Sequence, residues 1–303
     1  MSLKIGLIDV DGHNFPNLCL MKISAYHKAR GDDAEWCLPL KHYDVVYQSK
    51  VFDDTYSPDI DWQPDADEII KGGTGYGLNN KLPYEIEHTY PDYDIYPSLT
   101  ENTAYGFLTR GCPRGCDFCI VSAKEGRASK QVADLDEFWR GQRKIKLLDP
   151  NLLACKDAGR LLRQLVDSKA YVDFTQGLDI RLMQDEYIDA LNQMRVKRLH
   201  FAWDNPSDKL ETVFRDFAAK YKRKNNKSVY VLTGYNSTHE EDMYRVQTLI
   251  SLGYDPYVMI FDKPSAPKIT RHLQRWCNAP PLRKSCTFAE YLKTKRYTGE
   301  EKQ

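Results

Sequence analysis

The residues of this chain that are best suited to do chemistry are three clustered cysteines, Cys112, Cys116 and Cys119. Their spacing is C-x3-C-x2-C, whereas the other five cysteines are scattered. Three thiolates can ligate three irons of a cubane cluster and leave the fourth iron open to a substrate. Structural zinc sites and structural clusters normally have four protein ligands, and no fourth Cys or His stands at short spacing here. The pattern therefore predicts a reactive iron–sulfur centre.

The alternative for these cysteines is a zinc site completed by a distant ligand, for which Cys155, Cys277 and Cys286 are the candidates. Zinc sites usually come as paired short-spaced motifs, which disfavours this interpretation. Two or three scattered cysteines are also too few for a second, fully Cys-ligated cubane. The rival function is accordingly a non-catalytic zinc- or cluster-binding module, including a nucleic-acid-associated regulatory protein.

Composition restricts the class of protein. The chain has 303 residues, 42% of them hydrophobic, which is enough for one large domain or two ordinary ones with a real core. Its 43 basic and 43 acidic residues cancel, so a strongly basic nucleic-acid binder is not indicated. No apolar run approaches the roughly 18–20 residues that span a bilayer. The first residues lack a signal-peptide cleavage region, so we expect a cytoplasmic protein with reduced thiols and no membrane association.

The elements before the cysteines predict an α/β domain over residues 1–97, with strands that alternate with a helix. The expected strands are residues 4–10, 34–38, 43–47 and 66–70, and the expected helix is residues 17–30. Residues 81–97 are rich in Tyr, Pro and Asp, which is typical of a linker or of a loop that crosses between units. This alternation favours a Rossmann-like, doubly wound parallel sheet, whose ligand-facing loops lie at the carboxyl ends of the strands.

Residues 98–263 predict a second α/β series that positions the cysteine loop after its first strand. The expected strands are residues 104–109, 144–148, 171–175, 198–203, 228–233 and 257–261. The expected helices are residues 133–142, 154–168, 185–194, 209–222 and 240–252. Six strands with intervening helices predict a partial (βα)6 TIM-type barrel, open on one side. Residues 264–303 are expected to pack on this barrel and to end in a loose terminus.

At this point the sequence resembles a known family. The segment LTRGCPRGCDFC, with an aromatic residue between its last two cysteines, is similar to the signature of the radical S-adenosylmethionine (radical SAM) superfamily. It looks like the subgroup with an N-terminal cobalamin-binding-type domain. The resemblance implies a [4Fe–4S] cluster that reductively cleaves S-adenosylmethionine to a 5′-deoxyadenosyl radical, which abstracts hydrogen from a substrate carbon. It also implies an electron donor such as flavodoxin or ferredoxin.

The resemblance suggests roles for residues near the cysteines and after the second barrel strand. Phe118 would lie near the adenine, or would simply pack in the loop. Asp149 and Asn151 replace the Gly-Gly-Glu element that contacts the methionine amine in many family members, and a carboxylate suits that cation. Asp-Pro-Asn is also ordinary turn chemistry, so both interpretations stay open.

Gln176 and Arg181 follow the third barrel strand. By its position in the family pattern, Arg181 would form a bidentate pair with the methionine carboxylate. The alternative for Arg181 is a surface ion pair with Asp179 or Asp185.

The next two strand ends complete the expected contacts to S-adenosylmethionine. Asp204, with Asn205 as an alternative, stands where family members often grip the ribose hydroxyls. Thr233 and Gly234 end the fifth strand, where a glycine would let the backbone approach the adenine. The acidic run at 240–242 fits a helix N-terminus and is interpreted as capping.

Cobalamin binding is left open. Residues 11–16 partly match the D-x-H-x-x-G motif that ligates cobalt through histidine, with His13 in place but Pro16 at the last position. Gly72 and Gly73 lie where such domains approach the nucleotide tail. If cobalamin binds, methyl transfer to the substrate carbon follows as the expected outcome. The alternative is a vestigial domain that helps close the barrel.

The substrate class is also left open among small molecules, peptides and nucleotides. The basic runs 220–224 and 271–275, with aromatic Tyr221 and Trp276 beside them, have the composition of a nucleic-acid contact. Charged runs on helices are more often solvated faces, and the net charge is zero. Nucleic acid is therefore not the favoured substrate.

Overall fold

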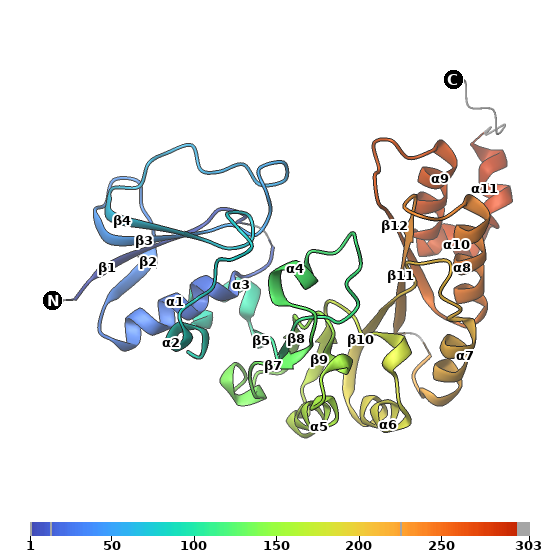
Figure 1. Cartoon of the computed structure of the whole chain (residues 1–303), viewed down its shortest axis with the longest axis horizontal. Coiled ribbons are helices and arrows are strands. Elements are labelled where there is room, and N and C mark those ends of the chain that lie inside the picture. The colour runs from blue at the N-terminus through green and yellow to red at the C-terminus, as the bar shows by residue number, and fades with distance from the viewer. Residues whose placement is uncertain (1, 13, 225, 296–303) are drawn as a thin grey trace. The chain divides into compact units, whose positions relative to one another are not determined.

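The computed structural model describes residues 2–12, 14–224 and 226–295. The chain separates into two compact units, Met1–Leu148 and Asp149–Gln303, which are described in turn (Figure 1). The domain boundaries predicted after residues 97 and 263 stay predictions. Among the described residues, no helix is both long and apolar enough to cross a membrane.

The first unit begins with a four-stranded parallel sheet in the order β2-β1-β3-β4. Its strands and its helix are β1 (Lys4–Asp9), α1 (Leu18–Ala29), β2 (Asp33–Trp36), β3 (Tyr43–Ser49) and β4 (Ala66–Gly72). The strand β1 alternates its side chains between the two faces, as a pleated strand must. Ile5 and Leu7 pack with Leu20 of α1, whereas Ile8 packs on the opposite face with Val46.

The two faces of this sheet are covered differently. Figure 1 shows α1 along one face and the long loop between β3 and β4 over the other. In that loop, Ile60 and Trp62 pack against the core around Ile8 and Val46. The predicted parallel α/β character is confirmed, and the full Rossmann-like, doubly wound arrangement stays a prediction.

The helix α1 begins where its sequence predicts. The side chain of Asn17 accepts the N–H of Leu20 at 3.3 Å and donates to the Ser49 hydroxyl at 2.8 Å. It therefore caps the helix and fastens it to the end of β3. The helix ends at Ala29 with Arg30 as its C-cap, and Gly31 follows at φ +85°, a conformation that favours glycine.

The remainder of the first unit contains short elements. They are α2 (Tyr84–Glu87), the three-ten helix Tyr93–Ile95, α3 (Pro97–Thr100), β5 (Thr103–Gly106), β6 (Thr109–Arg110), α4 (Val121–Glu125), β7 (Lys130–Gln131), the three-ten helix Leu135–Glu137 and β8 (Lys144–Leu147). The strands β5 and β8 pair in parallel. The helix predicted over 133–142 is wrong, because only the three-ten turn at 135–137 forms before Gly141 adopts φ +95°.

The second unit repeats strand and helix. Its elements are the three-ten helix Leu152–Ala154, α5 (Ala158–Ser168), β9 (Tyr171–Phe174), the three-ten helix Ile180–Leu182, α6 (Asp185–Gln193), β10 (Arg195–Ala202), α7 (Glu211–Lys220), β11 (Lys227–Thr233), α8 (His239–Ser251) and β12 (Asp255–Ile260). The strands β9 to β12 pair in parallel in chain order. Phe201 of β10 packs in the core against the rings of Phe214 and Phe217 of α7.

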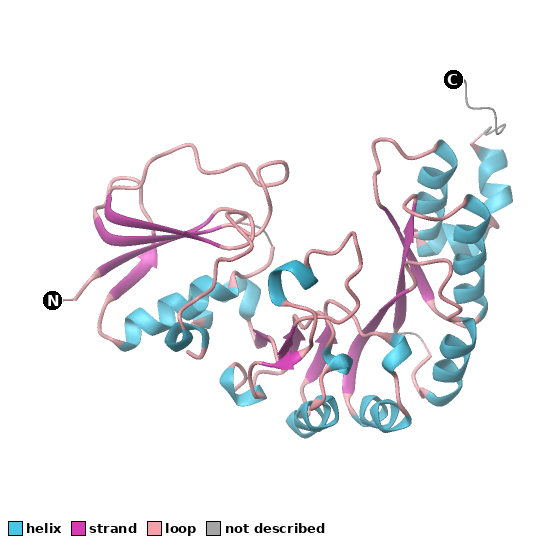
Figure 2. Ribbon diagram, in the orientation of Figure 1, coloured by secondary structure: helices cyan, strands magenta, loops and turns pink. Residues whose placement is uncertain are grey.

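Three further helices, α9 (Lys268–Cys277), α10 (Pro280–Ser285) and α11 (Phe288–Thr294), follow β12 (Figure 2). The side chain of Asn278 accepts the Val258 N–H at 2.7 Å and donates to the Val258 carbonyl at 2.9 Å. This amide therefore satisfies the backbone of the edge strand β12. The loose terminus predicted for the end of the chain falls on 296–303, outside the described residues.

Parallel strands alternating with helices confirm the mixed α/β class for both units. Closure of the six predicted strands into one partial (βα)6 barrel stays a prediction.

The tight packing of Gly106 at the end of β5 is testable. A Cβ built on Gly106 would lie 2.3 Å from Cγ of Phe138, inside a buried ring. We expect Gly106→Ala to lower the free energy of unfolding by about 1–3 kcal/mol, because the ring must shift. Urea denaturation measures this difference.

Gly159→Ala in α5 is the matched control, because its Cβ would meet the flexible Glu186 carboxylate at 3.0 Å and the Tyr187 ring at an ordinary contact distance of 3.7 Å. Alanine favours a helix over glycine by about 1 kcal/mol, so this variant should be as stable as the native chain or more stable. Equal unfolding free energies for Gly106→Ala and the native chain would contradict the packing argument.

Candidate iron–sulfur loop and strand-end site

The three clustered cysteines lie on one loop of the first unit. Residues 111–129 connect β6 to β7, which pair antiparallel through Thr109 with Gln131 and Arg110 with Lys130. The helix α4 lies inside the loop, directly after the third cysteine. The two short strands thus bring the ends of the loop together, and all three thiols belong to the same excursion of the chain.

Two glycines give the loop its shape. Gly111 has φ +90°, and a Cβ there would lie 2.2 Å from the Ala128 carbonyl oxygen. Gly115 has φ +58°, and a Cβ there would meet the Arg127 guanidinium at 2.1 Å. Since other residues pay a steric penalty at positive φ, the loop needs glycine at Gly111 in particular.

The thiols of Cys112, Cys116 and Cys119 are partly exposed and form no disulfide. Hydrogen bonds run from the Cys119 N–H to the Cys116 carbonyl at 2.9 Å and from the Cys112 N–H to the Gly126 carbonyl at 3.2 Å. Within the described ranges, no three His, Cys, Asp or Glu side chains are grouped to hold a metal ion. A cubane is larger than one ion, and three accessible thiols on a glycine-shaped loop are the donor set that it requires.

The distant cysteines proposed for a zinc site have other partners or surroundings. Burial raises the pKa of the Cys277 thiol to about 11, and this thiol donates to the Pro256 carbonyl at 3.4 Å. Cys286 donates to the Leu282 carbonyl, and Cys155 is buried. Since a metal ligand must be a thiolate, these surroundings disfavour metal binding at Cys277.

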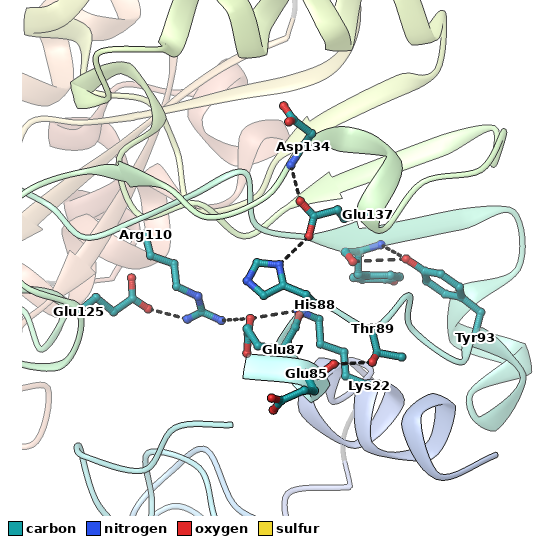
Figure 3. Close-up of polar contacts among 11 residues, drawn as sticks. Lys22, Glu85, Glu87, His88, Thr89, Tyr93, Arg110, Glu125, Asp134 and Glu137 are labelled. Carbon is teal, nitrogen blue, oxygen red and sulfur yellow. Dashed lines mark hydrogen bonds and ion pairs between the residues drawn. The ribbon is translucent and has the colours of Figure 1, made fainter. Parts of the chain in front are cut away.

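A row of charged side chains that the sequence did not predict lies at the start of the cysteine loop. Figure 3 shows Lys22, Glu87, Arg110 and Glu125 in a line of alternating charge. Their spacing along the chain is irregular, so no sequence pattern could have indicated that they meet.

The residues expected to contact S-adenosylmethionine lie mostly after strands of the parallel series. Asp149 and Asn151 follow β8 and are buried. Gln176 follows β9 and is exposed, next to Gly177 at φ +93°. In the first unit, Phe118 is 39% exposed.

Arg181 already has carboxylate partners. Its Nε donates to Asp179 at 2.7 Å, and its Nη1 donates to Asp208 at 2.6 Å. The ion pair with Asp179 that the sequence analysis left as an alternative therefore forms, whereas Asp185 pairs with Lys220 instead. These bonds hold Arg181 in place after β9, and its proposed role toward the methionine carboxylate stays a prediction.

Thr233 and Gly234 differ in exposure at the end of β11. The Thr233 side chain is fully buried and donates to the Met259 carbonyl at 3.2 Å. Gly234 is exposed and has φ +70°. The backbone at Gly234, and not the Thr233 hydroxyl, is thus available to a ligand at this strand end.

Asp204, the ribose candidate, lies at the end of β10, where the buried side chain of Arg245 holds the backbone. The guanidinium donates to the carbonyls of Trp203 at 2.6 Å and Asp204 at 2.9 Å, and to that of Leu232 in β11 at 2.9 Å. It also pairs with Asp242. One side chain from α8 therefore fixes the strand ends that carry Asp204 and Gly234.

Arg245 was not among the predicted site residues, because the acidic run before it is explained by helix capping alone. Glu241 and Thr238 do form a capping box, which confirms part of that interpretation. Asp242 is buried instead, and burial raises its pKa while the nearby Arg245 lowers it. An arginine three residues after an aspartate was the available signal.

Comparison with known proteins gives related sequences over part of the chain. No family model matches. The ribosomal protein uS12 methylthiotransferase RimO of Pseudomonas aeruginosa is 28% identical over 137 residues, which are 43% of this chain and 30% of that protein. The tRNA-2-methylthio-N(6)-dimethylallyladenosine synthase of Flavobacterium psychrophilum is 25% identical over 189 residues, 58% of this chain and 36% of that protein. The chain thus spans about a third of the length of these relatives.

Among solved structures, the fold is similar to that of the radical S-adenosylmethionine methyltransferase TsrM from Kitasatospora setae, solved with cobalamin and a [4Fe–4S] cluster bound. The TM-score is 0.63 at 12% identity, over 86% of this chain and 75% of that one. The chain that has this fold also carries the C-x3-C-x2-C motif. The relatives in sequence are methylthiotransferases, and the neighbour in structure is a radical S-adenosylmethionine methyltransferase. The family resemblance seen in the sequence is thereby confirmed, and the predicted cofactors, a [4Fe–4S] cluster and S-adenosylmethionine, agree with it.

The loops after the N-terminal strands are hydrogen-bonded to one another. Buried Asp11, after β1, accepts the N–H groups of Val51 and Phe52, after β3. Gly75, after β4, donates its N–H to the Lys50 carbonyl at 2.9 Å. His13, the candidate cobalt ligand, lies outside the described residues.

Removal of the Arg245 guanidinium should destabilise the second unit. Arg245→Met leaves Asp242 buried without its partner and three strand-end carbonyls without a donor, so we expect a loss of about 3–5 kcal/mol. Chemical denaturation measures the loss.

The control is Arg215→Met, which removes an exposed partner of Glu211 and should change stability by less than about 1 kcal/mol. Similar small losses for both variants would show that Arg245 does not hold the strand ends.

Proposed function

We propose that this chain is a radical SAM enzyme in which Cys112, Cys116 and Cys119 hold a [4Fe–4S] cluster. The observation that carries the proposal is the glycine-shaped loop with three accessible thiols, within a fold similar to that of a radical SAM methyltransferase. When bound, the cluster supplies the electron that cleaves S-adenosylmethionine, giving the 5′-deoxyadenosyl radical that abstracts hydrogen from a substrate carbon. The rival function of a non-catalytic metal module is not favoured by the relatives.

The chain's own residues bind and orient in this proposal. Asp149, with Asn151 beside it, takes the methionine amine, because a buried carboxylate favours a cation. Arg181 takes the methionine carboxylate, for which it would exchange one of its aspartate partners. Gln176, which is exposed and stands five residues before Arg181 in the sequence, offers an amide for a further hydrogen bond.

The remaining contacts concern the nucleoside. Asp204 accepts the ribose hydroxyls, and Arg245 keeps its backbone in place. The exposed backbone of Gly234 approaches the adenine, and Thr233 supports it from the buried side. Phe118 packs against the same base from the cysteine loop. The partial barrel and the Rossmann-like domain are part of this proposal.

The substrate, the electron donor and the compartment are proposals of the same kind. A flavodoxin or ferredoxin would reduce the cluster in a reducing cytoplasm. The names of the relatives include a ribosomal protein and a tRNA, so peptide and nucleotide substrates stay alongside small molecules. The aromatic residues of the two basic runs, Tyr221 and Trp276, are buried and do not offer a stacking surface to nucleic acid.

Anaerobic reconstitution tests the cluster. We expect about four irons per chain, absorbance near ~400 nm, and dithionite-dependent release of 5′-deoxyadenosine. Alanine at Cys112, Cys116 or Cys119 should abolish all three, because each thiolate holds one iron. Alanine at partly exposed Cys37 is the control and should leave them unchanged. Bound zinc without cleavage in the native chain, or cleavage that survives loss of a loop cysteine, would refute the proposal.

Cobalamin-dependent methyl transfer is the finer proposal, and the similarity to TsrM favours it. With His13 outside the described residues, we assign no step to cobalamin. Incubation with hydroxocobalamin followed by desalting should leave a red protein with about one cobalamin per chain. His13→Ala separates histidine ligation from binding without a histidine, because only the former shifts the visible spectrum. A colourless native protein would exclude this finer proposal and leave S-adenosylmethionine cleavage untouched.

A further inference from the structure

The cysteine loop needs more support than its strands provide. The strands β6 and β7 are 2 residues each, yet they must hold the excursion of residues 111–129 between them. A loop of this length without other contacts would sample many shapes. Three thiolates can ligate one cluster only when the loop keeps a single conformation. Some other interaction must therefore select that conformation.

The carboxylate of Glu125 supplies that interaction. It lies at the end of α4, and its side chain is only 11% exposed. Its Oε2 accepts the Gly111 N–H at 3.0 Å, and its Oε1 accepts from Nη1 of Arg110 at 3.0 Å. In the adjacent bond, the Cys112 N–H donates to the Gly126 carbonyl at 3.2 Å. Glu125 therefore ties the residues just before the first cysteine to the far end of the loop.

Arg110 is held from its other side as well. Its guanidinium stacks on the Phe107 ring at 3.8 Å from the centroid, and its Nη2 lies 3.8 Å from Glu87 Oε1. Glu87 in turn pairs with Lys22 of α1 at 3.0 Å (Figure 3). These contacts fix the position of the Arg110 guanidinium, and they thereby also fix the Glu125 carboxylate that is bonded to the guanidinium.

We propose that Glu125 is the positioning residue of the cysteine loop. It sets the backbone at Gly111 and Cys112, and with Arg110 it sets the charge near the first cluster ligand. The second part rests on the proposed function, because it requires a cluster on the loop. Charges and hydrogen bonds outside the ligand set tune the reduction potential of an iron–sulfur centre. Glu125 touches no reacting atom and acts through the cysteine that it orients.

The first experiment measures amide hydrogen exchange on the reduced, cluster-free chain by mass spectrometry. In Glu125→Gln the side-chain amide has one oxygen for two donors, so either Gly111 or Arg110 loses its acceptor. Exchange across residues 111–126 should accelerate about tenfold or more, as expected for loss of a charge-assisted hydrogen bond. Exchange at the native rate would overturn the proposal.

Glu137→Gln is the matched control. Glu137 also accepts one backbone N–H, from Asp134 at 2.9 Å, and one side-chain contact, from His88 at 2.8 Å. Both of these contacts are to residues outside the cysteine loop (Figure 3). Its replacement should accelerate exchange near residue 134 and leave residues 111–126 at the native rate. Equal acceleration of residues 111–126 in both variants would overturn the assignment to Glu125.

The second experiment measures the reduction potential and the electron paramagnetic resonance spectrum of the reconstituted cluster. Glu125→Gln removes a negative charge and leaves Arg110 less neutralised, so the potential should become more positive. Glu125→Asp keeps the charge and should retain a near-native potential, even though its shorter side chain leaves the loop exchanging faster. A purely structural role would lower the iron content without moving the potential of the clusters that remain, and that result would overturn the charge assignment.

The two proposals fail in different ways. A native chain that binds no iron would refute the proposed function, whereas the exchange measurement on the cluster-free chain would still decide whether Glu125 holds the loop. A native chain that binds iron, with unchanged exchange in Glu125→Gln, would refute only the positioning role.

Discussion

Backbone N–H and C=O groups at the ends of strands need hydrogen-bond partners outside the sheet. In this chain, charged side chains provide those partners close to the candidate site residues. The Arg245 guanidinium accounts for three carbonyls at the ends of β10 and β11. The Asp11 carboxylate accepts two N–H groups after β3, and the Glu125 carboxylate accepts the Gly111 N–H. Buried charges are costly unless they are paired and hydrogen-bonded, so each of these side chains tolerates few alternative arrangements of its loop.

This arrangement separates the residues that would touch a ligand from those that shape the loops. The three cysteines are partly exposed and Gly234 is exposed. The side chains that hold their backbone, Arg245 and Glu125, are almost wholly buried. A ligand site needs accessible groups in a fixed geometry, and the burial of the supporting charges provides the rigidity.

In the N-terminal sheet, too, the backbone groups after the strands have hydrogen-bond partners, but these bonds join the loops to one another. Its loops after β1, β3 and β4 are joined through Asp11 and through the bond from Gly75 to Lys50. The crevice at the carboxyl ends of a parallel sheet is where such folds bind ligands. Here protein groups already occupy the polar backbone atoms of those loops, so a ligand must bind beside these bonds or replace them.

The sequence by itself determined the local features of this protein. The spacing of Cys112, Cys116 and Cys119 and the alternation of strand and helix are short-range features of the sequence, which is why the family resemblance and the α/β class could be predicted. Only the tertiary structure decided which charges meet. Glu87 and Arg110, or Arg245 and the carbonyl of Trp203, are far apart along the chain and come together through packing. Folding also placed the Thr233 hydroxyl on the buried side and gave Arg181 two aspartate partners. Periodicity predicts which strand a residue follows, whereas long-range contacts decide what its side chain can reach.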